Sequence, residues 1–183
     1  DDARMALAQA SLVRGKLDEA IGVFEKVNPK SERYPLALYL SGRTYWHRYL
    51  MQRMGGDPAK KDKVAADRAK AVERVTNSLA GFRKAAEANK PLTPQHVESQ
   101  LLMALLHLDG KEAKQSADLL QPLVDQVKAA TPQALDETTV RIFRAALQAD
   151  LAIGDVAKAS DVGVVLCDLG ADTLPVNGVL VEF

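Results

Sequence analysis

The residue types that most often carry out chemistry are few in this sequence and do not form a catalytic pattern. The chain contains three histidines, His47, His96 and His107, and a single cysteine, Cys167. His96 and His107 are eleven residues apart, about three turns of a helix, which is too far for both to bind one metal ion. Cys167 follows the apolar residues 164–166, where we expect a buried and inert thiol.

Sequence signatures of enzymes are also absent. There is no Gly-x-Ser-x-Gly motif, no phosphate-binding glycine-rich loop after a strand, no dinucleotide fingerprint and no His-Glu-x-x-His pair. The sequence therefore predicts a protein that is not an enzyme and that uses no metal ion and no cofactor.

A cluster of aromatic residues is the most prominent candidate for binding. All four tyrosines and the single tryptophan fall within residues 34–49, together with Arg43. Tyr39 and Trp46 are seven residues apart and would share one face of a helix. Aromatic side chains with polar tips beside an arginine are typical of binding hot spots. Alternatively, these side chains pack between helices.

Charge and composition exclude several classes of partner. The 183 residues carry 24 Lys+Arg and 24 Asp+Glu, a net charge of zero, which argues against a nucleic-acid binder. The longest apolar runs span only a few residues, far below the roughly 20 that cross a bilayer, so we expect no membrane insertion. One cysteine excludes an internal disulfide and is compatible with a reducing, cytoplasmic compartment. Since the chain begins at Asp1 without an initiator Met, we expect an excised or processed piece.

Apolar residues recur at helical spacing along nearly the whole chain, which predicts an all-α protein. Gly15, Gly110 and Gly154 mark tight turns, and Pro122 is expected to kink its helix or to shift its start. The helices are expected at about residues 3–14, 17–27, 34–54, 72–89, 94–108, 111–130, 136–153 and 156–169.

Two segments do not follow this pattern. Residues 57–70 alternate basic and acidic side chains, which predicts an exposed, salt-bridged connection that is at most partly helical. Residues 173–183 are apolar around Asn177-Gly178, a turn signal, and are expected to form an extended tail that covers the last helices. The alternatives for this tail are the start of a further domain or a segment that pairs with a partner.

The sequence also repeats itself. Gly15 to Ala20 and Gly154 to Ala159 share a glycine, a branched aliphatic residue and an alanine at the same spacing. The two segments lie 139 residues apart, about four periods of roughly 34 residues. The glycine permits a left-handed turn, and the alanine lets the second helix cross the first closely.

On these residues, with Leu7, Phe24 and Pro29 in the first unit, the chain resembles the tetratricopeptide repeat (TPR) family. The second unit matches through Gly42, Tyr45 and Phe82, whereas the fourth has Gly163 in place of the aromatic residue. The resemblance implies an α-solenoid of about four helix-turn-helix units over residues 1–172, wound as a right-handed superhelix. It also implies an insertion at about 55–70, before the tail at 173–183.

The resemblance further implies a scaffold that binds a peptide or protein segment in a concave groove. The groove-lining positions expected from the family pattern are Met5, Gln9, Leu12, Tyr39, Arg43, Trp46, His47, Gln100, His107, Arg141, Arg144 and Gln148. Three arginines would make this wall modestly basic and suited to an acidic peptide or a terminal carboxylate. The Lys/Asn clamp of the chaperone-binding members is not found, since Met5 and Gln9 occupy its positions in the first unit.

Other functions remain open from the sequence. The predicted groove residues can equally be a solvated helix face. Exposed helix edges or the tail can make the chain a self-associating module that forms homo-oligomers. Convergent polar groups from several helices can also form a buried site for a small ligand.

Overall fold

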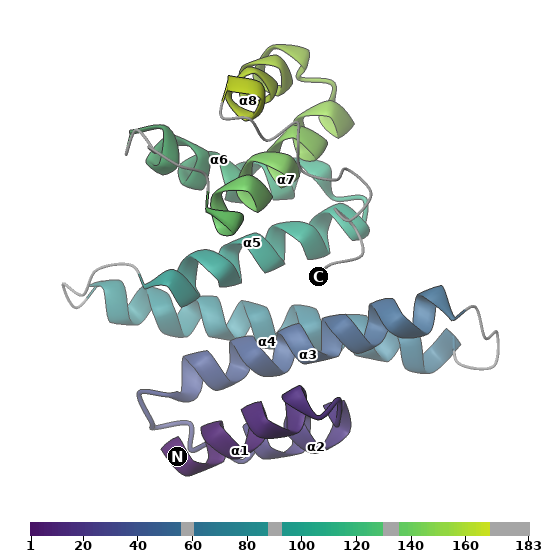
Figure 1. Ribbon diagram of the computed structural model, residues 1–183, viewed down its shortest axis with the longest axis vertical. Helices are drawn as coiled ribbons and strands as arrows, with labels where there is room; N and C mark the ends of the chain where they lie inside the picture. The colour runs from purple at the N-terminus through teal and green to yellow at the C-terminus, as the bar shows by residue number, and fades with distance from the viewer. Residues whose placement is uncertain (56–60, 88–92, 130–135, 169–183) are drawn as a thin grey trace. The chain divides into compact units, whose positions relative to one another are not determined.

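The structure is a computed structural model that describes residues 1–55, 61–87, 93–129 and 136–168. These ranges contain eight α-helices and no strand (Figure 1), which confirms the all-α prediction. The helices are α1 Asp2–Val13, α2 Leu17–Phe24, α3 Tyr34–Met54, α4 Lys61–Glu87, α5 Pro94–Asp109, α6 Ala113–Ala129, α7 Glu137–Ile153 and α8 Val156–Asp168. Within the described residues, no helix is long and apolar enough to cross a membrane.

The chain divides into two compact units. Unit 1 spans Asp1–Ser99 and unit 2 spans Gln100–Phe183, so that the boundary falls inside α5. In unit 1, α1 packs on α2, α2 on α3, and α3 on α4. In unit 2, α6 packs on α7 and α7 on α8. Within each unit, these consecutive helices are therefore also neighbours in space.

The core of the first helices in unit 1 mixes small and large side chains. Ala8 and Ala20 are fully buried and let α1 and α2 approach closely, while Phe24 fills the space beside them. This agrees with the roles that the repeat pattern predicts for Ala20 and Phe24. The cluster is completed by Met5, Val27 and Ala37.

Glycine also sets the distance between α3 and α4. A Cβ atom at Gly42 would lie 2.8 Å from Cγ2 of Val75, and a Cβ at Gly81 would lie 2.7 Å from Cγ of Pro35. Any side chain at either position would push the two helices apart. Gly42, one of the residues through which the second unit matches the TPR pattern, therefore has a packing role.

Three helix turns share one hydrogen-bond pattern. Gly15 (φ 72°), Lys111 (φ 63°) and Gly154 (φ 79°) adopt the left-handed conformation after α1, α5 and α7. In each turn the next amide donates to the carbonyl five residues earlier, as from Lys16 to Ser11 at 2.9 Å, which is the Schellman motif. The prediction that Gly15 and Gly154 form equivalent turns is confirmed.

The third turn corrects the sequence analysis by one residue. Gly110 was expected to be its left-handed residue, but Lys111 has this conformation. The small residue five positions later is therefore Ser116, which is buried like Ala20 and Ala159 at the same distance from their glycines. A lysine in the left-handed region carries steric strain that a glycine does not.

The charged segment before residue 70 also differs from its prediction. Helix α4 begins at Lys61 instead of near Val72, so residues 61–70 are helical. Asp67, expected to be solvated, is only 3% exposed because it pairs with Arg48 of α3. Pro122 does not interrupt α6, which begins at Ala113 and continues to Ala129. Residues 56–60 and the tail at 173–183 lie outside the described residues.

Candidate functional site

Four of the predicted binding residues, Tyr39, Arg43, Trp46 and His47, lie on α3, but on different sides of it. The side chains of Tyr39 and Trp46 are each 4% exposed, so they lie inside the packing of unit 1. Arg43 and His47 are exposed and, being four residues apart, share one face of α3. The accessible part of the predicted site on α3 is therefore polar and cationic.

The buried aromatic residues hold α3 in place. The Tyr39 hydroxyl donates to Oε2 of Glu98 in α5 at 3.4 Å. Trp46 stacks on Tyr49 with ring centroids 5.0 Å apart, and the Arg53 guanidinium lies 5.6 Å from the centroid of the Tyr49 ring. Nε1 of Trp46 is buried and has no hydrogen-bond partner among the described residues. These contacts are those of a packed interior, the alternative that the sequence had left open for this cluster.

A network of ion pairs joins α3 to α2 and α4. The Arg48 guanidinium donates to both carboxylate oxygens of Asp67, at 2.8 Å from Nε to Oδ2, and also pairs with Asp18 of α2. The bidentate hydrogen bonding to Asp67 raises the pKa of Arg48. This network fixes the register of the three helices.

A second part of the network is centred on Glu25. Its Oε1 accepts hydrogen bonds from the Tyr45 hydroxyl at 3.2 Å and from Arg74 at 2.9 Å. Burial raises the pKa of Tyr45, and the negative charge of Glu25 raises it further. The Tyr45 hydroxyl and Arg74 of α4 therefore meet at one carboxylate oxygen of Glu25.

The predicted residues of unit 2 lie on one side of α7. Arg141, Arg144 and Gln148 are spaced three and four residues apart and are all half-buried. Gln100, on the α5 segment of the same unit, is also half-buried. Of the twelve predicted groove-lining residues, five lie in unit 2, namely these four and His107, and the other seven lie in unit 1.

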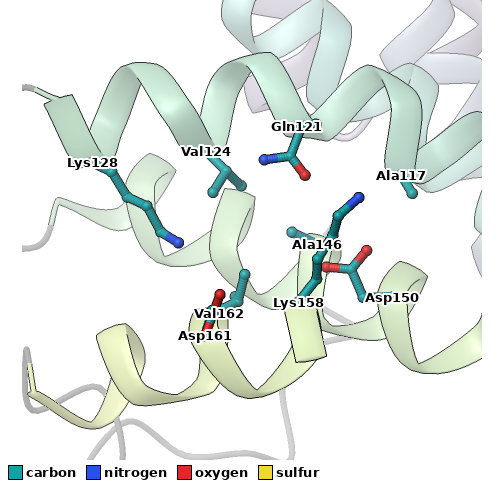
Figure 2. A pocket seen from close by; sticks show the side chains of 9 residues that line it. All are labelled: Ala117, Gln121, Val124, Lys128, Ala146, Asp150, Lys158, Asp161 and Val162. Atoms are coloured by element: carbon teal, nitrogen blue, oxygen red, sulfur yellow. The ribbon is translucent and has the colours of Figure 1, made fainter. Parts of the chain in front are cut away.

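The opposite side of α7 borders a pocket that the sequence analysis did not find (Figure 2). It has a volume of about 70 Å³ and is lined by residues of α6, α7 and α8. By helical spacing, its α7 residues Ala146 and Asp150 face away from Arg144 and Gln148. The full lining is Ala117, Gln121, Val124, Lys128, Ala146, Asp150, Lys158, Asp161 and Val162.

Asp150 is the unusual member of this lining. It is 5% exposed, and its carboxylate makes no hydrogen bond or ion pair with any described residue. Lys158, the nearest cation, pairs instead with Asp155 at 3.6 Å. Burial raises the pKa of Asp150, Lys158 opposes this rise, and the negative charge of Asp155 adds to it.

A wider hollow of about 370 Å³ adjoins the pocket along α6. It shares the lining residues Ala117, Gln121 and Lys158 with the pocket, so the two hollows lie next to each other. Its other lining residues are Lys114, Asp118, Pro122, Asp125 and Ile153. The only sequence signal for this region is Asp150, an acidic residue where the repeat pattern expects an aromatic one.

The structure also shows where Cys167 and the buried histidine His96 lie. Cys167 was expected to be buried, but it is exposed, because the side of α8 that carries it does not face α7. His96 is buried and stacks on Phe82, with ring centroids 5.8 Å apart. Within residues 1–55, 61–87, 93–129 and 136–168, no three potential metal ligands lie together.

Comparison with known proteins supports the fold. No model of a protein family matches the chain, and no curated protein sequence does. The chain is similar to a crystal structure of nearly identical TPR-like repeats from a Podosopora anserina protein assigned to the kinesin light chains. That match has a TM-score of 0.50 and 16% identity, and it covers 94% of this chain and 96% of that chain. A variant of the same protein matches with a TM-score of 0.49 and 16% identity, over 94% of this chain and 95% of that chain. The predicted TPR-like fold is therefore confirmed.

Proposed function

We propose that this TPR-like chain is a non-catalytic protein-interaction module that binds a peptide or protein segment of a partner. The observation that carries the proposal is the fold itself, which matches TPR-like repeats over 94% of the chain. Stacked helical pairs of this kind create extended surfaces whose shape is fixed by the packing behind them. Such surfaces serve binding better than they serve chemistry, which needs convergent reactive groups.

The residues proposed to contact the partner are the accessible ones of the predicted set. In unit 1 these are Arg43 and His47, which α3 presents on its exposed face. In unit 2 they are Gln100, Arg141, Arg144 and Gln148. Tyr39 and Trp46 would act indirectly, since their packing against neighbouring side chains holds α3 rigid beneath Arg43 and His47.

The chemistry of these faces favours an acidic partner segment. Arginine pairs with carboxylates through two parallel hydrogen bonds, which gives both affinity and orientation. Arg43, Arg141 and Arg144 supply three guanidinium groups of this kind. The proposed partner therefore carries aspartate, glutamate or a terminal carboxylate where it meets α3 or α7.

Affinity capture with variants tests this function. The immobilised chain is compared with the double variant Arg43→Ala/His47→Ala and with Arg144→Ala. Lys26→Ala/Lys30→Ala serves as the matched control, since both lysines are exposed and outside the proposed faces. We expect at least one site variant to lose a partner that the control retains, with an unchanged unfolding midpoint. Equal capture by all variants would remove these faces from the proposal.

Self-association is a second candidate, favoured by the exposed apolar residues of α8. Val156 and Val164 are 69% and 55% exposed and lie on a side of the helix that also carries Ser160 and Cys167. Light scattering of the chain and of Val164→Glu distinguishes the two functions, with Val13→Glu of α1 as the control for an exposed valine. A monomer in all three samples would exclude self-association through α8.

A further inference from the structure

The pocket between α6, α7 and α8 contains a largely buried carboxylate, that of Asp150, which forms no hydrogen bond with a cationic side chain of the described residues although Lys158 lies nearby. Asp150 is 5% exposed, and no described residue donates a hydrogen bond to its carboxylate, although its backbone carbonyl accepts from the amide of Asp155 at 2.9 Å. Lys158 neighbours Asp150, but its ammonium pairs with Asp155, whose carboxylate also accepts from the amide of Lys158 at 3.1 Å. Asp155 therefore keeps Lys158 engaged at the start of α8.

A buried charge without a partner disfavours folding. Burial removes most of the water around the carboxylate, and no hydrogen bond from a described residue replaces it. An isosteric neutral side chain would avoid this penalty. Arrangements that disfavour folding, such as a buried charge without a hydrogen-bond partner, are most often found at functional sites, where a ligand supplies the missing interaction. Asp150 is thus poised to receive a group from outside the chain.

The shape of the pocket restricts what that group can be. Figure 2 shows the Asp150 carboxylate beside the side chain of Lys158, and the pocket is also lined by Ala117 and Gln121 of α6 and Ala146 of α7. The volume of about 70 Å³ admits only a few water-sized groups. An ammonium group with its last methylene groups is compact enough to enter, whereas a planar guanidinium is larger and prefers a flat, bidentate partner.

We propose that this pocket binds a primary ammonium group, as carried by a lysine side chain of a partner protein. The Asp150 carboxylate accepts the hydrogen bonds of the ammonium. The small apolar side chains that line the pocket, Ala117, Val124, Ala146 and Val162, contact its methylene groups. The site lies on the side of α7 opposite Arg144, so it goes beyond the function proposed above and does not depend on it.

The adjoining hollow gives the rest of the partner segment a path. It runs along α6 and shares Ala117, Gln121 and Lys158 with the pocket. The combined lining holds four aspartates, Asp118, Asp125, Asp150 and Asp161, against three lysines, Lys114, Lys128 and Lys158. The surplus of negative charge favours a basic segment over an acidic one.

A titration with a blocked lysine tests the proposal directly. N-acetyl-lysine N-methylamide is added to the full chain while the carboxyl carbon of Asp150 is followed by NMR. N-acetyl-norleucine N-methylamide, which lacks the ammonium, and the arginine analogue are the comparisons. We expect a saturable shift with the lysine compound only, with a dissociation constant on the order of millimolar for so small a ligand. A shift that does not saturate, or one that norleucine or arginine reproduces, overturns the proposal.

Variants assign the binding to Asp150. Asp150→Asn should weaken binding of the lysine compound by about tenfold or more, because an amide cannot neutralise the ammonium. Glu137→Gln, which replaces an exposed carboxylate at the start of α7 outside both hollows, should leave it unchanged. Lys158→Met should bind at least as tightly as the original chain, since it removes a neighbouring cation. Weaker binding by Lys158→Met, or unchanged binding by Asp150→Asn, contradicts the proposed site. If Asp150→Asn does not fold, the comparison of lysine with norleucine on the unmodified chain decides.

Discussion

Arg48 of α3 donates two hydrogen bonds to the carboxylate of Asp67, a residue of α4 that is only 3% exposed. The two residues are 19 positions apart in the sequence, and their pairing connects the two longest helices of unit 1. Replacing Arg48 by methionine keeps an unbranched side chain without the guanidinium group and leaves the buried charge of Asp67 behind. We expect the Arg48→Met variant to lose about 3–5 kcal/mol of unfolding free energy in urea titrations.

The control for this prediction is an ion pair on the surface of α4, the helix that carries Asp67. Lys70 pairs with Glu73 at 2.9 Å, and both side chains are well exposed. Lys70→Met should cost less than about 1 kcal/mol. The double variant Arg48→Met/Asp67→Leu should recover most of the loss of Arg48→Met. Equal effects of Arg48→Met and Lys70→Met would show that burial of Asp67 contributes nothing.

Substitutions at the three left-handed turn residues should change the stability of the chain in opposite directions. Gly15 and Gly154 have open space where a Cβ would lie, so only their φ angles of 72° and 79° disfavour a side chain. Gly15→Ala and Gly154→Ala should therefore each destabilise the chain by about 1–2 kcal/mol. Lys111→Gly should stabilise it by up to about 1 kcal/mol, because glycine accepts φ near 63° without strain.

Thermal unfolding of the three single variants checks these signs. Gly22→Ala in α2 is the control, since this glycine also has open space but does not have positive φ. There, alanine should be neutral or stabilising. A Lys111→Gly variant that melts below the original chain would contradict the assigned role of Lys111.

The surroundings of His96 predict that the folded state of unit 1 is less stable in acid. Its burial lowers its pKa below the ordinary 6.5, and the positive charge of Arg83 lowers it further. The unfolded chain therefore takes up a proton at a higher pH than the folded chain does. Stability should fall as the pH drops below about 6.5 and should level off once the pH is below the pKa of the folded state.

Urea unfolding at pH 7.5 and at pH 5.5 measures this loss. His96→Gln should reduce the difference between the two pH values, because glutamine does not titrate. Arg83→Met should reduce it in part, since burial of the ring is the larger cause. An unchanged difference in His96→Gln would assign the acid sensitivity to other groups.

Asp150 predicts the opposite dependence on pH. Its pKa is raised above 3.8 in the folded protein, chiefly by burial, so the folded chain holds this proton more tightly than the unfolded chain. The ionised carboxylate is then a penalty that is complete above the raised pKa and disappears as the pH falls toward 3.8. Asp150→Asn should accordingly melt higher than the original chain at pH 7, and the gain should shrink toward pH 4.

A lower melting temperature of Asp150→Asn at pH 7 would contradict this prediction. If Asp150 stabilised the turn after α7 through Lys158, Asp150→Asn would lower the melting temperature at pH 7. Differential scanning calorimetry at both pH values separates the two cases. Asp125→Asn, on an exposed carboxylate of α6, provides the comparison for a general loss of negative charge.

The sequence predicted those features that depend on local conformation. Gly15 and Gly154 could be recognised because a left-handed turn strongly favours glycine, and the buried Ala20 and Ala159 follow at a fixed spacing. Lys111 escaped recognition because a lysine gives no sign of a left-handed conformation. The helical boundaries were close for the same reason, except at α4, where alternating charges concealed ten helical residues at 61–70.

Features that depend on distant neighbours could not be predicted. The interleaved charges around Asp67 look solvated until Arg48 is brought against them. Trp46 and Tyr39 have the composition of a hot spot, but whether a helix face is covered depends on the other helices. The Asp150 pocket needs side chains from three helices, so no short motif marks it. The exposed Cys167 followed from the orientation of α8, which its apolar neighbours in the sequence did not reveal.

The packing of each helix mainly on its neighbour in the chain has a consequence for folding. Most contacts within each unit close short loops, so little chain entropy is lost before the first hairpins form. We expect the protein to assemble rapidly from adjacent hairpins. For the same reason, heat or mechanical force should unravel it stepwise from an end, with α1 and α8 exchanging their amide hydrogens long before α3 and α4 do.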